Sequence, residues 1–176
     1  MNNIRKYLNY TPRIAADAYI EPSAVVIGRV TIGENSSLWC NAVARGDVAD
    51  IIIGKSSNIQ DLTMLHVTHA NPGRSEETPL IIGDFVTIGH HCCLHACTLK
   101  NNILVGMSTT ILDNVIVEDN VMIGAGSLVP PNKHLESGYL YLGNPVKQIR
   151  KLTDDEIKFL HYSATHYVQV ANEHKS

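Results

Sequence analysis

The feature that most constrains the fold of this chain is an aliphatic residue that recurs with a period of six. The repeat contains, in chain order, Ile14, Ile20, Val26, Ile32, Leu38, Ala44, Ile53, Ile59, Leu65, Ile82, Ile88, Leu94, Val105, Ile111, Val117, Ile123 and Val129, and its phase shifts after Ala44, Leu65 and Leu94. An α-helix would require a period of about 3.6 residues, and an ordinary half-buried strand a period of 2. A period of six instead predicts a parallel β-helix, in which each unit is one short strand plus a bend and three units form one coil of a triangular prism.

Two interruptions of the repeat predict insertions. The longer one lies between Leu65 and Ile82 and includes Asn71–Pro79, which is rich in turn-forming residues. The other lies between Leu94 and Val105, where the step of 11 residues predicts five extra residues around Lys100–Asn102. Loops that protrude from a regular coil often carry function.

The repeat fades after Val129, and a helix signal follows. Thr153 and Glu156 have the spacing of a capping box, and apolar residues continue from there at helical spacing. We therefore expect a mainly β protein in which residues 1–150 form the β-helix. Residues 151–176 are expected to form an amphipathic C-terminal helix that packs on a prism face, its own or a neighbour's.

Composition excludes several classes of function. The net charge is −3 with histidine neutral, so the chain has no broad basic field for binding nucleic acid. No apolar run approaches the ~18 residues of a membrane helix, and Met1–Lys6 contains no apolar signal-peptide core. These observations predict a cytoplasmic protein whose four cysteines stay reduced.

Counting the repeat units places three histidines in space. If the long insertion belongs to one unit, Arg45, His66 and His95 occupy one position on the same face in consecutive coils. Asp61 and His90 are then stacked one coil apart on the preceding face. If the insertion spans two units, His66 and His95 fall on different faces, and the count alone leaves both arrangements open. Three imidazoles with an open fourth position are typical of a catalytic zinc site.

Four motifs in this stretch, taken together, resemble one known family. They are Arg45-Gly46-Asp47, then Asn58-Ile59-Gln60-Asp61, then His66 eight residues after Asn58, and finally His90 and His95 five residues apart. In order and spacing they resemble the gamma-class carbonic anhydrases of the hexapeptide-repeat superfamily, particularly their short bacterial YrdA-type branch. The resemblance runs from about Ile14 to Pro145 and implies that the β-helix is left-handed.

The resemblance implies a homotrimer with a metal ion at each subunit interface. His66 and His95 would come from one chain and His90 from its neighbour. The metal would be Zn²⁺, with Fe²⁺ or Co²⁺ as alternatives, since all three accept imidazole ligands.

Roles for the surrounding polar residues follow from the same resemblance. Arg45 and Asp47 would form an ion pair between subunits, and Asp61 would orient a ligand histidine. Gln60 would hydrogen-bond the metal hydroxide or the substrate, and Asn58 would hold the local backbone.

The implied activity is that of a carbonate dehydratase, a lyase that hydrates CO2 reversibly to bicarbonate by attack of a metal hydroxide. Turnover then requires a group that passes a proton to solvent. Two acidic positions of the archaeal relatives match Val48 and His69 here. Val48 cannot carry a proton, whereas an imidazole titrates near neutrality, so His69 is the predicted shuttle.

Two alternatives stay open at this point. A trimeric metal-binding protein with little or no hydrase activity is favoured by the loss of both acidic positions. An acyltransferase of the same superfamily would use one catalytic histidine and a coenzyme A groove between subunits, and would not require three spaced histidines. Strand alternation also predicts that one of Cys92 and Cys93 points into the core, and Tyr162 and Tyr167 are expected to pack on the core or an interface.

Overall fold

A computed structural model describes residues 3–73 and 75–176. Met1, Asn2 and Arg74, which the predictions for the chain start and the long insertion include, lie outside the described residues. The strands are β1 (Ile4–Arg5), β2 (Arg13–Ile14), β3 (Tyr19–Ile20), β4 (Val25–Ile32), β5 (Ser37–Leu38), β6 (Val43–Ile53), β7 (Asn58–Ile59), β8 (Met64–His66), β9 (Leu80–Ile82), β10 (Val86–Ile88), β11 (Cys93–His95), β12 (Thr98–Leu99), β13 (Ile103–Val105), β14 (Thr110–Ile111), β15 (Ile116–Val117), β16 (Met122–Ile123), β17 (Leu128–Val129), β18 (His134–Leu135), β19 (Tyr139–Leu142) and β20 (Lys147–Lys151), and the helix is α1 (Asp154–Lys175).

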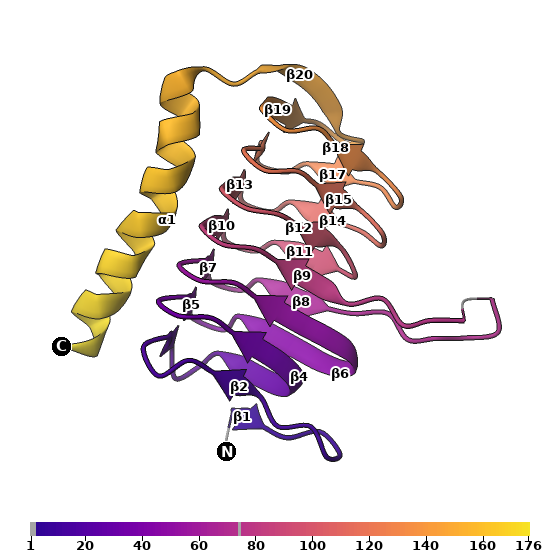
Figure 1. The fold of residues 1–176 in the computed structure, drawn as a ribbon, viewed down its shortest axis with the longest axis vertical. Helices are drawn as coiled ribbons and strands as arrows, with labels where there is room; N and C mark the ends of the chain where they lie inside the picture. The colour runs from indigo at the N-terminus through magenta and orange to yellow at the C-terminus, as the bar shows by residue number, and fades with distance from the viewer. Residues whose placement is uncertain (1–2, 74) are drawn as a thin grey trace.

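Short parallel strands stack coil upon coil to form a prism (Figure 1). One face is a sheet in the order β19-β16-β13-β10-β7-β5-β3, with β20 added antiparallel at its end. The long strands β4 and β6 bend around a corner, so the other two faces are joined into one sheet. The predicted class, mainly β with a parallel β-helix and a C-terminal α-helix, is confirmed.

The repeat residues form the core in columns. On one face Ala44 pairs with Leu65, Leu65 with Leu94, and Leu94 with Ile111, and each of the four is fully buried. Burial of one such Leu or Ile side chain stabilises the fold by about 1.5–3 kcal/mol relative to leaving it exposed. Each face of the prism places one aliphatic side chain in the core per coil, on top of its equivalent in the coil before. Because each face takes about six residues, the aliphatic residue recurs every six positions.

Asparagines make many of the corners between strands. Six of them have φ between 56° and 63°, the left-handed region that Asn tolerates better than most residues. They are Asn35, Asn41, Asn102, Asn114, Asn120 and Asn132. Some also bond to each other across coils, with Asn114 Nδ2 donating to Asn132 Oδ1 at 3.0 Å.

The predicted five-residue insertion around Lys100–Asn102 is wrong. Leu99, in β12, pairs with Ile82 on one side and Val117 on the other, so it is itself the inward residue of a unit. The preceding unit, from Leu94, has five residues and not six, which moved Leu99 out of the sixfold phase. The error left the pairing of Leu65 with Leu94 unaffected.

The long insertion lies within one unit, as the first of the two counts requires. Strand β6 pairs with β8 through Val43 and Ala44 and with β9 through its last residues, so Leu65 and Ile82 lie on adjacent faces. The loop between them projects away from the prism (Figure 1). Its base is closed by Thr68 and Thr78, whose backbone N–H groups each donate to the other's carbonyl at 3.1 and 2.8 Å.

Helix α1 lies along the face built by β3, β5, β7, β10 and β13, and its C-terminus returns toward the N-terminal end of the coil (Figure 1). The predicted capping box is present: Thr153 Oγ1 accepts from the Glu156 N–H, and Glu156 Oε2 accepts from the Thr153 N–H. Leu160, Ala164 and Ala171 are its buried side chains. None of the helical structure in residues 3–73 and 75–176 has the length and apolarity needed to cross a membrane.

Candidate metal centre

Two histidines face each other on consecutive coils. His66 ends β8, His95 ends β11, and the two residues pair directly in the parallel register. Their ring centroids are 5.1 Å apart, and Nδ1 of His66 lies 3.1 Å from Nε2 of His95. The register predicted for these two residues is therefore observed. Arg45 precedes His66 in the same column, because Val43 and Ala44 pair with Met64 and Leu65.

A carboxylate contacts the far nitrogen of each ring. Nε2 of His66 lies 3.1 Å from Oδ1 of Asp47, and Nδ1 of His95 lies 2.6 Å from Oδ1 of Asp113. A carboxylate can only accept from a neutral imidazole, so each of these nitrogens carries the ring's N–H. Sequence analysis did not find Asp113, although the repeat gave a signal: it follows Ile111, which stacks on Leu94.

In the neutral form of each ring, the facing nitrogen therefore presents a lone pair. Burial lowers the pKa of His66 and outweighs the hydrogen bond to Asp47, which raises it, while the nearby charge of Arg45 also lowers it. Two lone pairs 3.1 Å apart repel each other unless a cation lies between them. The donor set thus has the chemistry and the spacing that a metal ion shared by two imidazoles requires.

Asp47 is held from two sides. It contacts the Arg45 guanidinium as well as His66, and although burial raises its pKa, the hydrogen bonds from Arg45 and His66 outweigh that and hold the pKa below its usual value. Between the two charges, Gly46 packs so closely on the previous coil that a Cβ atom would lie 2.6 Å from the Arg29 carbonyl oxygen. Arg-Gly-Asp here is a bend that brings both charges to His66.

His90 lies two residues after β10, which is on the face next to that of the His66–His95 pair. Its Nδ1 is 2.8 Å from Oδ2 of Asp61, which stacks one coil earlier as predicted. This contact leaves Nε2 of His90 available. Within a single chain, residues 3–73 and 75–176 contain no group of three His, Cys, Asp or Glu side chains arranged to hold a metal ion.

Gln60 and Asn58 form a buried polar chain below His90. Gln60 Nε2 donates to Asn58 Oδ1 at 3.1 Å, Asn58 Nδ2 donates to Thr87 Oγ1 at 3.0 Å, and Thr87 lies 3.2 Å from Ser163 of α1. With Gln60 Nε2 engaged, its Oε1 is left as an acceptor. Gln60 and His90 line one cavity of about 310 Å³, together with Met107 and Tyr167 among others.

Other predicted residues lie outside these contacts. His69 is exposed at the base of the long loop, and Val48 packs against the core. Cys92 is buried, which raises the pKa of its thiol to about 11, whereas Cys93 is exposed, so the predicted alternation of these two residues is confirmed. The Tyr162 side chain is exposed, but Tyr167 is half-buried beside the cavity.

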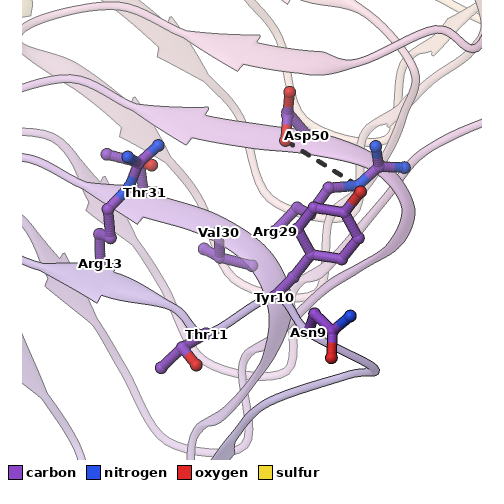
Figure 2. Close-up of a pocket in the computed structure, with 8 residues that line it drawn as sticks. All are labelled: Asn9, Tyr10, Thr11, Arg13, Arg29, Val30, Thr31 and Asp50. Atoms are coloured by element: carbon purple, nitrogen blue, oxygen red, sulfur yellow. Dashed lines mark ion pairs between the residues drawn. The ribbon is translucent and has the colours of Figure 1, made fainter.

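A second cavity, of about 340 Å³, lies at the N-terminal corner of the prism (Figure 2). Arg29 lies in it, with its guanidinium 4.9 Å from the centre of the Tyr10 ring and 3.9 Å from Asp50. Both terminal nitrogens of Arg29 donate to Glu77 of the long loop, at 2.8 and 2.7 Å. None of the residues predicted for the metal site lines this cavity.

Curated relatives match the chain along nearly its whole length. It is 52% identical over 171 residues to protein YrdA of Escherichia coli, which covers 97% of this chain and 93% of the relative. It is 42% identical over 173 residues to a carbonic anhydrase of Geobacillus kaustophilus, covering 98% and 91%. Gamma carbonic anhydrase 2 of Arabidopsis mitochondria is 45% identical over 166 residues, which are 94% of this chain.

The chain belongs to the gamma-class carbonic anhydrase family. The predicted family, and with it a carbonic anhydrase-like enzyme, is confirmed at this level. The chain spans 59% of the length of the Arabidopsis relative. No family model matches it.

The solved structures that are similar to this chain are hexapeptide-repeat proteins. A Bacillus cereus protein provisionally named an acetyltransferase has a TM-score of 0.90 at 39% identity, covering 97% of this chain and 95% of that one. A hexapeptide transferase family protein of Anaplasma phagocytophilum has a TM-score of 0.87 at 42% identity, covering 96% and 95%.

Proposed function

We propose that this protein is a carbonate dehydratase, which hydrates CO2 reversibly to bicarbonate at a metal site between subunits of a homotrimer. The observation that carries the proposal is the pair of facing nitrogens of His66 and His95, 3.1 Å apart, whose other ring nitrogens contact Asp47 and Asp113. A cation between these nitrogens would be bound by one lone pair from each ring. Zn²⁺ is the proposed metal, with Fe²⁺ or Co²⁺ as alternatives.

His90 is the proposed third ligand, supplied by the neighbouring subunit. Its place on a different face from the His66–His95 pair supports this division, because in a symmetric ring each interface joins unlike faces of two copies. The Asp61 contact at Nδ1 leaves Nε2 as the nitrogen directed toward such a site. When bound, the metal lowers the pKa of water to about 7 and supplies hydroxide at neutral pH, as is established for zinc in carbonic anhydrases.

The remaining residues orient the reactants and move the proton. Gln60 presents its free Oε1 in the cavity beside His90, where it orients the attacking oxygen or CO2. Arg45 and Asp47 fix the His66 ring and, at the interface, bind the neighbouring chain, while Asn58 holds Gln60. His69, exposed at the loop base, passes the proton to buffer. A cytoplasmic location completes the proposal and agrees with the four free thiols.

Metal content and CO2 hydration, measured together, test this proposal. The protein as isolated is analysed for bound elements and oligomeric state, and then assayed by stopped flow after loading with Zn²⁺, Fe²⁺ or Co²⁺. Metal-dependent hydration that is lost in His95→Ala supports the hydrase. A trimer that binds metal without hydrating CO2 favours the metal-binding alternative. Absence of metal binding, with binding of coenzyme A instead, would favour the acyltransferase.

A further inference from the structure

Asp113 is held through both of its carboxylate oxygens, as Asp47 is. Its Oδ1 accepts from His95 Nδ1 at 2.6 Å, and its Oδ2 accepts from the Thr68 hydroxyl at 2.6 Å. Both oxygens are thus fixed, so the carboxylate has one orientation relative to the imidazole. The Asp113 side chain is 24% exposed, compared with 36% for Asp61 in the equivalent contact with His90.

Thr68 is itself fixed by the backbone. It lies two residues after His66 and forms the two-way backbone bond with Thr78 at the base of the long loop. Glu77, the residue before Thr78, is bound by both terminal nitrogens of Arg29. A continuous set of contacts therefore holds the Thr68 hydroxyl, and through it Asp113, against the rigid coil.

We propose that Asp113, oriented by Thr68, is a positioning residue for the metal ligand His95. By accepting from Nδ1 it fixes the tautomer and the ring orientation that direct Nε2 toward His66, and its charge makes Nε2 a stronger electron-pair donor. Asp113 does not touch the substrate or the metal in this assignment. The inference rests on the proposed function, and it adds that the third coil, as well as the two that carry His66 and His95, determines metal affinity.

Zinc affinity of the trimer, measured by competition with a chromophoric chelator, tests the inference. Asp113→Ala is expected to weaken zinc binding by about 10–100-fold, as loss of such a partner does at other zinc sites. Asp113→Asn removes the charge and replaces one acceptor oxygen with an NH2 donor, but it keeps one acceptor and should weaken binding less, and Asp113→Glu should restore part of the affinity. Thr68→Val is expected to weaken binding by a smaller factor than Asp113→Ala, and Thr68→Ser should restore it.

The matched control is Asp119→Asn. Asp119 also follows a strand at a corner of the coil and accepts from the Asn101 backbone N–H at 2.7 Å, but it binds no proposed ligand. Its zinc affinity should equal that of the wild type. The visible absorption spectrum of the Co²⁺-loaded protein gives a second readout, because a reoriented His95 changes the ligand field and a purely structural defect does not.

The outcomes separate this inference from the proposed function. If the wild type binds zinc and both Asp113→Asn and Thr68→Val bind it equally well with unchanged Co²⁺ spectra, the positioning role is wrong and the metal site stands. If the wild type binds no divalent metal, the proposed function fails first. Should Asp113→Ala not fold, Asp113→Asn and Thr68→Val decide the question, since both preserve side-chain volume.

Discussion

His95 lies directly over His66, one coil later on the same face, with the facing ring nitrogens 3.1 Å apart. These two side chains must therefore come from one chain at any shared site. His90 is on the neighbouring face of that chain. If His90 completes the site from a second subunit, the three ligands divide into a pair and a single residue, and that division can be tested by mixing variants.

We expect trimers assembled from equal amounts of His66→Ala and His90→Ala chains to regain part of the zinc that each variant alone loses. An interface works only where an intact His66–His95 pair meets an intact His90, so random assembly restores about one quarter of the sites. The measurement is zinc per trimer after co-refolding the two variants.

The control mixture is His66→Ala with His95→Ala. Both residues lie on the same side of every interface, so no combination of these chains rebuilds a site. Equal recovery in both mixtures, or none in either, would contradict a ligand set divided between subunits.

His69→Ala is expected to slow CO2 hydration most when buffer is scarce. The His69 side chain is exposed at the loop base, where it can exchange protons with solvent, and abundant buffer would replace it as the proton acceptor. Stopped-flow rates at low and high buffer concentration measure this, with His134→Ala, also exposed, as the control. A variant that matches the wild type at low buffer would remove His69 from proton transfer.

The sequence predicted those parts of the fold that repeat. The spacing of six residues left two arrangements open, and the one with the long insertion in one unit, which pairs His66 with His95 and Asp61 with His90, is the one observed. The helix was predicted because Thr153 and Glu156 form a capping box by spacing alone. The division into residues 1–150 and 151–176 stays a prediction.

What the sequence did not predict depends on contacts between coils. Asp113 is 18 residues from His95, and the wrong insertion before Val105 moved Ile111, and with it Asp113, off the face that carries Leu94 and His95. Leu99 was missed because the unit before it, from Leu94, has five residues, so the fixed period assigned Leu99 to an insertion. Both errors arise where the pairing of strands between coils departs from a count of six residues along the sequence.

Leu99→Ala tests that correction. Leu99 is fully buried between Ile82 and Val117, so truncation should lower the free energy of unfolding by about 2–5 kcal/mol. If residues around it formed an inserted loop, the cost would be close to zero. Urea unfolding measures the difference, and Leu8→Ala, at a side chain that is 70% exposed, should cost far less.

The start of α1 predicts a pH-dependent contribution to stability. The Arg150 guanidinium, which donates to both carboxylate oxygens of Glu156 at 2.8 and 2.7 Å, and the Thr153 N–H lower the pKa of Glu156 from 4.5 to about 2. Because the folded pKa is the lower one, this contribution is fully present above pH 4.5 and is lost as the pH falls toward 2. The wild type should therefore be more stable than Glu156→Gln at pH 6, and the difference in stability between the two proteins should narrow below pH 4.5. Thermal melts by circular dichroism from pH 6 to pH 2.5 measure it, and Arg150→Met should shrink the gap at pH 6. A gap that stays constant, or widens in acid, would show that Glu156 keeps its ordinary pKa in the folded protein.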